Sequence, residues 1–333
     1  MRALVLSEFG VYTNLISKEV PEPILADDGV ILSVRATAVN FADSLLVAGR
    51  YQFKPPLPFI PGKCPAGVIE IVGRNVSGFK TGDRVLTLAD IGGFGERLAV
   101  KAKDCFLLPA SMTFAEAASL SSIFDTAWIA IHRRGMLRSG ETLAVLGGSS
   151  GVGLAATQLA RATGANVLSI VQSSEKAGVA RAAGARVIIL PGSESASVRD
   201  EILRLTEGKG ADVVVDLIGG PLFANTLRAV AWEGRVVIVG FASGNIPEIQ
   251  TNYLLLKNIS LSGMQISDYR RRHPDLIAQC WHDIFDLFQR GLVKPVPTVV
   301  WPIARAPEAL SDLASRRAAA RIVLEQADTH RYD

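Results

Sequence analysis

Cysteine is scarce in this chain: three thiols, Cys64, Cys105 and Cys280, are scattered over 333 residues. They are too few and too far apart for a disulfide framework, which is typical of a reducing compartment. The N-terminal sequence MRALVLSEFG opens like a strand and lacks a signal-peptide pattern. No apolar stretch reaches the length of a membrane span. We therefore expect a cytoplasmic protein with no membrane partner.

Histidine is also rare, with four residues in total, and none of them precedes His132. A catalytic zinc needs three protein ligands drawn from cysteine, histidine and carboxylates, and a structural zinc usually needs four clustered thiolates. The chain contains no C-x-x-C pair. The sequence therefore predicts no metal site.

An excess of charge of one sign is missing as well. The 35 basic and 32 acidic residues give a net charge of +3 and are mixed along the chain, so no nucleic-acid partner is expected. The one basic run, Arg270 to Arg272 with His273, precedes Pro274. We interpret it as a solvated loop, with a phosphate or RNA patch as the alternative.

Hydrophobic residues make up 49% of the chain, enough for about two domains of ordinary size. Up to about residue 120, short β-like runs are broken by glycine and proline. From about Phe114, helices alternate with buried strands, which predicts a doubly wound parallel sheet. A helix over 277–288, a helix over 306–315 and a strand over 322–324 are expected near the end. The other expected strands cover 30–36, 67–72, 84–88, 142–146, 166–171, 187–190, 212–217 and 235–239.

The segment Leu143 to Arg161, LAVLGGSSGVGLAATQLAR, is an apolar run, a glycine-rich turn and a small-residue helix. Glycines let the backbone approach a pyrophosphate closely, and the N–H groups at the start of the helix receive its charge. The segment therefore predicts a dinucleotide-binding turn. Its expected cofactor-binding residues are Gly148, Ser149, Ser150, Gly151, Val152 and Gly153.

The same turn also spells the G-x-S-x-G elbow of serine hydrolases around Ser149. A hydrolase further needs an acid and then a histidine, and Asp216 followed by His273 or His282 gives that order. No local motif supports these partners, and Gly153 is not needed in an elbow. We favour nucleotide binding and keep the hydrolase as an alternative.

The end of the second strand bears on the choice of cofactor. NAD enzymes usually place Asp or Glu there, which would repel a 2′-phosphate. This chain instead continues as Gln172-Ser173-Ser174-Glu175-Lys176, with no acid at the tip. Ser173, Ser174 and Lys176 can supply hydroxyl donors and positive charge, so we expect NADPH. The alternative for Lys176 is a solvated position at a helix start.

Several motifs in order resemble the medium-chain dehydrogenases and reductases, in particular their zinc-independent quinone oxidoreductase branch, to which zeta-crystallin belongs. The resemblance covers nearly the whole chain. Its markers are Asn40 to Asp43, Gly49 to Tyr51, Pro58 to Gly67, Gly78 to Val85, Thr126 to Trp128, Ser150 to Gly153 and Asp216 to Gly219.

The resemblance implies a Rossmann domain over 123–265, inserted in a β-rich GroES-like catalytic domain formed by 1–122 and 266–333. It also implies a homodimer. Two residues depart from the pattern: Cys64 stands where an acid is usual, and Ser150 replaces a frequent glycine. Zinc-dependent relatives place a cysteine at the position of Asn40 and a histidine at that of Lys63.

The resemblance also places functional residues. Asn40 and Tyr51 are expected to donate hydrogen bonds to the substrate oxygen near the nicotinamide, and Asp43 to orient their loop; a turn-forming role is the alternative. Thr126 is expected near the nicotinamide, and Trp128 lines the substrate cleft or fills core. Further cofactor contacts are expected from Gly240, Phe241 and Arg316, the last at the 2′-phosphate.

The resemblance implies NADPH-dependent hydride transfer to quinones or related conjugated carbonyl substrates. Without a Lewis acid, the protein orients the reactants, excludes water and stabilises the developing oxyanion. The alternatives are an enone or enoyl double-bond reductase, and an NADPH-binding protein without catalysis.

Overall fold

The computed structural model of the chain describes residues 1–190, 197–315, 317–318 and 320–326. The chain separates into two compact units. The β-rich unit comprises Met1–Ser122, Arg272–Trp281 and Pro295–Asp333, and the parallel-sheet unit comprises Ile123–Arg271 and His282–Lys294. Residues 266–271 and 282–294 group with the parallel sheet.

The β-rich unit is organised around β3 (Gly29–Ala38), which pairs antiparallel with three other strands. Its β-branched residues Val30, Ile31 and Val34 are buried, because such side chains pack well on a pleated surface. The seven-stranded sheet has the order β14-β15-β3-β4-β5-β7, with β6 also on β3. The other strands are β1 (Arg2–Leu6), β2 (Leu15–Glu19), β4 (Ala66–Val72), β5 (Arg84–Thr87), β6 (Arg97–Lys101), β7 (Cys105–Leu107), β14 (Thr298–Pro302) and β15 (Arg321–Glu325).

Short helices complete this unit. Helix α2 begins with a capping box in which Thr113 and Glu116 satisfy each other's backbone N–H groups. The apolar core beneath α1 and α11 includes Leu46, Phe94 and Leu310. The helices of the unit are α1 (Phe41–Val47), α2 (Phe114–Leu120), α11 (Ala306–Ala314) and the 3₁₀ turns η1 (Tyr12–Asn14), η2 (Ala102–Asp104) and η5 (Ile303–Arg305).

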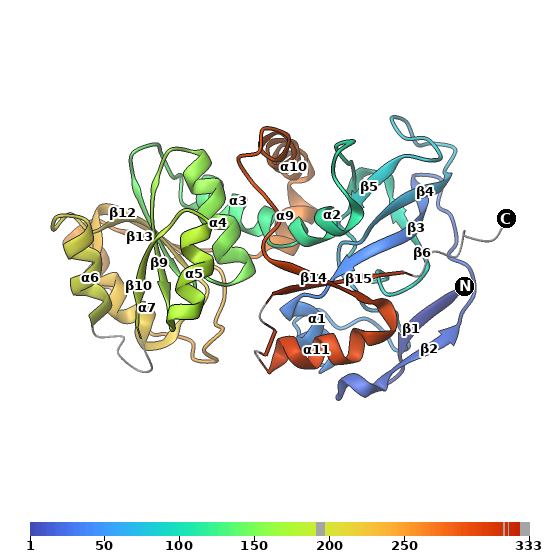
Figure 1. Cartoon of the computed structure of the whole chain (residues 1–333), viewed down its shortest axis with the longest axis horizontal. Coiled ribbons are helices and arrows are strands. Elements are labelled where there is room, and N and C mark those ends of the chain that lie inside the picture. The colour runs from blue at the N-terminus through green and yellow to red at the C-terminus, as the bar shows by residue number, and fades with distance from the viewer. Residues whose placement is uncertain (191–196, 316, 319, 327–333) are drawn as a thin grey trace. The chain divides into compact units, whose positions relative to one another are not determined.

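The second unit is a six-stranded parallel sheet of order β10-β9-β8-β11-β12-β13. Helices α4 and α5 lie on one side of this sheet and α6 and α7 on the other, as Figure 1 shows. The order reverses between β8 and β11, so their carboxyl ends form the switch point of a doubly wound sheet. The strands are β8 (Thr142–Leu146), β9 (Asn166–Val171), β10 (Arg186–Ile189), β11 (Ala211–Asp216), β12 (Val230–Ile238) and β13 (Ser260–Gly263).

The helices of this region include one π-helical stretch, η3 (Ile129–Arg134), which continues α3. The sheet core contains Leu146, Ile170 and Val214. The remaining helices are α3 (Phe124–Trp128), α4 (Gly151–Ala162), α5 (Ser174–Ala182), α6 (Val198–Leu205), α7 (Gly220–Leu227), α8 (Asn252–Lys257), α9 (Ile266–Arg272) and α10 (Pro274–Gln289), whose residues 274–281 group with the β-rich unit.

The predicted α/β fold class is confirmed, and strands 142–146 and 166–171 match β8 and β9 residue for residue. The interpretation of Arg270 to Arg272 as a solvated loop is wrong. These residues end helix α9, and the Arg270 guanidinium binds the buried Asp125 carboxylate at 2.6 and 2.9 Å. The partner lies 145 residues away, so the local sequence gave no sign of it. None of the described helices is both long and apolar enough to span a membrane.

Candidate active site

The first feature of the site is the glycine turn, defined here as residues 147–153, between β8 and α4. Ser150 begins the helix: its hydroxyl accepts a hydrogen bond from Gly153 N at 3.1 Å and donates one to Gly147 O at 2.8 Å. Ser150 therefore caps α4, a position at which Ser is favoured.

Two glycines of the turn lie too close to backbone or strand atoms for any side chain. A Cβ on Gly153 would stand 2.4 Å from Gly147 O, and a Cβ on Gly148 would stand 2.5 Å from the Cβ of Ser169 on β9. Gly147 has a φ of +86°, which favours glycine. The start of α4 is therefore held tightly against the sheet, as pyrophosphate-binding turns require.

The glycine turn follows β8 at the switch point, next to β11. Asp216 ends β11, and its carboxylate accepts hydrogen bonds from Ile218 N and Gly219 N, both at 2.9 Å. Burial raises the pKa of Asp216, and these N–H groups oppose the effect. Asp216, the acid required of a serine hydrolase, thus closes the turn after its own strand. This backbone cradle at a helix start fits a dinucleotide.

The end of β9 carries the residues expected at a 2′-phosphate. Ser173 begins α5, and its Oγ accepts a hydrogen bond from Lys176 N at 3.3 Å. The side chains of Ser174 and Lys176 are exposed. No acid intervenes between Val171 and Ser174. Arg316, expected at the same phosphate, lies outside the described residues.

Two further expected contacts follow β12, the neighbour of β11. Gly240 N donates to Asp216 O at 3.3 Å, and the Phe241 side chain is 39% exposed. Both residues therefore stand at the same carboxyl edge of the sheet as the glycine turn. Thr126 lies on α3 and is buried, with its N–H donating to the Asp125 carboxylate at 2.9 Å.

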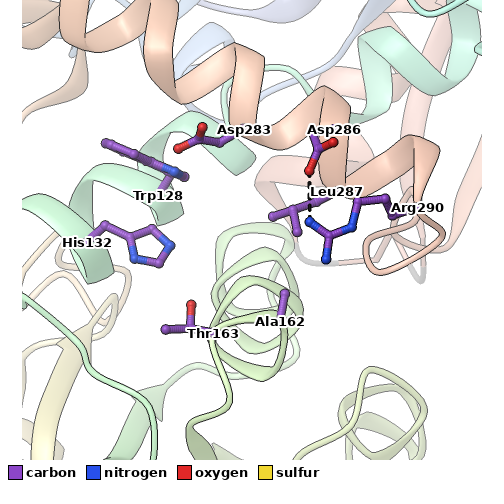
Figure 2. Close-up of a pocket in the computed structure, with 8 residues that line it drawn as sticks. All are labelled: Trp128, His132, Ala162, Thr163, Asp283, Asp286, Leu287 and Arg290. Atoms are coloured by element: carbon purple, nitrogen blue, oxygen red, sulfur yellow. Dashed lines mark hydrogen bonds and ion pairs between the residues drawn. The ribbon is translucent and has the colours of Figure 1, made fainter.

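Trp128 occupies a different part of the parallel-sheet unit. Figure 2 shows its indole beside His132 and Asp283, with Thr163 on the other side of a pocket of about 260 Å³. Thr163 follows the last residue of α4, which has 12 residues and is about 18 Å long. Trp128 therefore lies near the opposite end of α4 from the glycine turn. Burial lowers the pKa of His132, which favours a neutral ring in this pocket.

The β-rich unit contains a second group of site residues, here called the polar cluster: Asn40, Asp43, Lys63, Asp90 and Arg321. Asn40 precedes α1, and its backbone N–H donates to Asp43 Oδ2 at 2.9 Å. This contact belongs to a capping box, so Asp43 fixes the start of the helix. Asp43 is fully buried.

The side-chain amide of Asn40 is fully engaged. Its two N–H groups donate to Ala38 O at 3.0 Å and to Asp43 Oδ2 at 3.1 Å, and its carbonyl accepts from Arg321 Nη2 at 2.8 Å. Two acceptors at one end and a cation at the other fix the orientation of the amide. A bond from Asn40 to a substrate oxygen would first have to break one of these contacts.

Lys63 brings a buried positive charge into the cluster. Its Nζ donates to Asp90 Oδ1 at 2.8 Å and lies 5.1 Å from the centroid of the Tyr51 ring, over its face. The Lys63 side chain is 3% exposed. Tyr51 is half-buried and packs against the apolar core of the unit.

Burial and charge oppose each other in this cluster. Burial lowers the pKa of Lys63, but the Asp90 and Asp43 carboxylates outweigh it and hold the pKa above its ordinary value. Burial also raises the pKa of Asp43, against the opposing effects of the Lys63 charge and the Asn40 hydrogen bonds. At neutral pH Lys63 therefore carries its charge.

Sequence reasoning missed Asp90 and Arg321 and assigned Lys63 no positive role. Lys63 could have been noticed as a lone charge in the run Pro61 to Gly67, which is otherwise without charge. Arg321 reaches Asn40 across 281 positions of sequence, and no local pattern marks it.

Comparison with known proteins shows what the chain is similar to. Residues 26–110 match the family model of the alcohol dehydrogenase GroES-like domain, and residues 151–281 match that of zinc-binding dehydrogenases. Quinone oxidoreductase-like protein 2 of Rattus norvegicus is 32% identical over 310 residues, covering 93% of this chain and 88% of the relative.

Two solved structures are also similar over nearly the full length. The quinone oxidoreductase of Pseudomonas syringae pv. Tomato DC3000 has 27% identity and a TM-score of 0.88, covering 97% of this chain and 99% of that one. The CurK enoyl reductase has 25% identity and a TM-score of 0.87, covering 98% and 99%.

The fold and the glycine turn define a medium-chain dehydrogenase or reductase, an oxidoreductase class that uses a nicotinamide cofactor. Within that class, the chain belongs to the zinc-independent quinone oxidoreductase branch.

Zinc, which the name of one matching family model implies, does not fit the residues present. Within the part of the chain that the structure describes, no three His, Cys, Asp or Glu side chains are grouped so that they could hold a metal. In the polar cluster Asn40 offers a hydrogen-bonded amide and Lys63 a charged ammonium, and neither group is a zinc ligand.

Proposed function

We propose that the protein is an NADPH-dependent, zinc-independent reductase of quinones or related carbonyl-conjugated substrates. The observation that carries this proposal is the backbone-built turn at the switch point, followed by a second strand whose end offers Ser173, Ser174 and Lys176 and no acid. A hydroxyl and ammonium set suits a 2′-phosphate, which a carboxylate would repel.

In the proposed reaction the bound nicotinamide supplies a hydride. The glycine turn would hold the pyrophosphate, and Thr126, Gly240 and Phe241 would complete the cofactor site. Tyr51 donates a hydrogen bond to the acceptor oxygen as it gains charge, because a phenol can polarise a carbonyl. Asn40 and Asp43 hold the loop that carries this donor, and water supplies the proton to the reduced oxygen.

The test of cofactor choice is the variant Lys176→Glu. NADPH affinity should fall on the order of a hundredfold, because a phosphate-pairing charge is lost and like charges meet, while NADH affinity stays within about threefold. The matched control is Lys209→Glu, an exposed lysine of the same unit. Both affinities are measured by fluorescence titration. Equal affinity of the wild-type protein for both cofactors would refute the NADPH proposal.

A second candidate is reduction of an enone or enoyl double bond, favoured by the structural likeness to the CurK enoyl reductase. Both candidates need the same hydride and the same oxygen donor, so only the acceptor differs. Oxidation of NADPH with a matched panel of quinones and enones decides between them. A protein that binds NADPH but reduces no acceptor would be a binding protein. We also propose that the protein is a homodimer and that it is located in the cytoplasm.

A further inference from the structure

The polar cluster contains one buried ammonium, that of Lys63. Lys63 buries its ammonium, and burying a charge costs free energy unless a partner compensates it. Its carboxylate partner, Asp90, is itself 37% exposed. Of the three N–H donors of Lys63, the bond to Asp90 uses one among the contacts of the described residues. The ammonium therefore retains the capacity to act on a further negative charge.

The surroundings of Lys63 show where that charge would act. Its Nζ stands over the face of the Tyr51 ring at 5.1 Å from the centroid. Asn40 cannot help a developing anion without breaking its own contacts, because both amide hydrogens are bonded. Arg321 is bound to the Asn40 carbonyl and to Ser121 O at 2.9 Å. Among the polar cluster's cations, Lys63 is the one beside the proposed donor.

We propose that Lys63 supplies the positive charge that stabilises the oxyanion formed on the acceptor, acting through space beside Tyr51. This inference rests on the proposed function. The hydride brings two electrons to the conjugated acceptor, an electron pair moves onto its carbonyl oxygen, and water protonates that oxygen. The cofactor is oxidised and the acceptor reduced by two electrons. Lys63 keeps its proton throughout and contributes only its positive charge.

A purely structural role makes the opposite prediction for one variant. If the ion pair only ties residue 63 to residue 90, then Lys63→Met and Asp90→Asn should weaken the site alike. If the charge acts on an anion, Asp90→Asn leaves that charge less compensated and should favour anion binding. The two roles therefore differ in sign.

The experiment measures binding of 4-nitrophenolate, an anionic phenol that resembles the oxyanion, to the full-length protein by its absorption spectrum. We expect Lys63→Met to weaken phenolate binding about tenfold, Lys63→Arg to stay within about threefold of wild type, and Asp90→Asn to bind equally or more tightly. The neutral 4-nitroanisole should bind all four proteins alike. Melting temperatures check that each variant is folded.

Failure of wild type to bind the phenolate, or parallel losses in Lys63→Met and Asp90→Asn, would overturn the inference, as would equal loss of the neutral probe. Phenolate binding needs no turnover, so the two proposals can fail separately. Absence of turnover with every acceptor, beside the expected phenolate pattern, would count against the proposed function alone. Normal turnover of the wild-type protein, together with phenolate affinity that is unchanged in Lys63→Met, would count against the inference alone.

Discussion

The glycine turn of the parallel-sheet unit and the polar cluster of the β-rich unit are built from different parts of the polypeptide. The glycine turn is formed by backbone atoms of seven consecutive residues, 147–153. At Gly148 and Gly153 there is no room for a side chain. The polar cluster uses side chains from Asn40 to Arg321, brought together by the sheet and its loops. A backbone site tolerates side-chain change only where a Cβ fits, whereas a side-chain site depends on buried charges that balance each other.

The largest effect should come from breaking a buried charge pair. Arg270→Met leaves the Asp125 carboxylate buried without its cation, and the free energy of unfolding should fall by about 3–5 kcal/mol. The control is Arg271→Met in the next residue, whose pair with Asp268 is exposed and whose loss should cost less than about 0.5 kcal/mol. Denaturant unfolding measures both. Equal losses of unfolding free energy in the two variants would mean that burial does not determine how much an ion pair stabilises this protein.

The next effect concerns the backbone site. Gly153→Ala places a Cβ within 2.4 Å of Gly147 O, so α4 must shift, and NADPH affinity should fall about ten- to a hundredfold. Gly178→Ala is the control, because nothing lies within 4 Å of its Cβ and alanine favours a helix. Fluorescence titration compares the two. Normal NADPH binding by Gly153→Ala would show that the glycine turn is not the cofactor site.

A smaller effect is expected at Asn40 of the polar cluster and at Tyr51, which neighbours Lys63. Tyr51→Phe removes the proposed oxygen donor, and Asn40→Ala removes the amide that braces its loop; each should lower turnover about tenfold, because quinones are intrinsically reactive. NADPH affinity should stay within about threefold. Turnover with a reactive quinone and NADPH binding are measured on the same preparations. Unchanged turnover in both variants would leave these residues as loop formers.

The glycine turn is built from consecutive residues and the polar cluster from residues far apart in the sequence, and this difference explains what the sequence alone could predict. The strands β8 and β9, the glycine turn and the residues after β9 were all predictable, because each depends on a pattern within about 30 residues. The partners of Asn40 and Asp125 could not be predicted, because Arg321 and Arg270 are far away in the sequence. The sequence also does not distinguish a buried arginine from an exposed one. Trp128 could be assigned to cleft or core from its sequence, but not to a pocket with Asp283.

The most direct test of the whole account is a single-turnover experiment. Protein treated exhaustively with a chelator and loaded with NADPH is mixed with a quinone, and the decay of nicotinamide absorbance is followed. We expect rapid oxidation of one cofactor per chain, with no stoichiometric zinc in the same sample and with much slower decay in Tyr51→Phe and Lys63→Met. Persistence of NADPH with every quinone and enone, or activity that disappears together with a tightly bound zinc, would refute the proposed function.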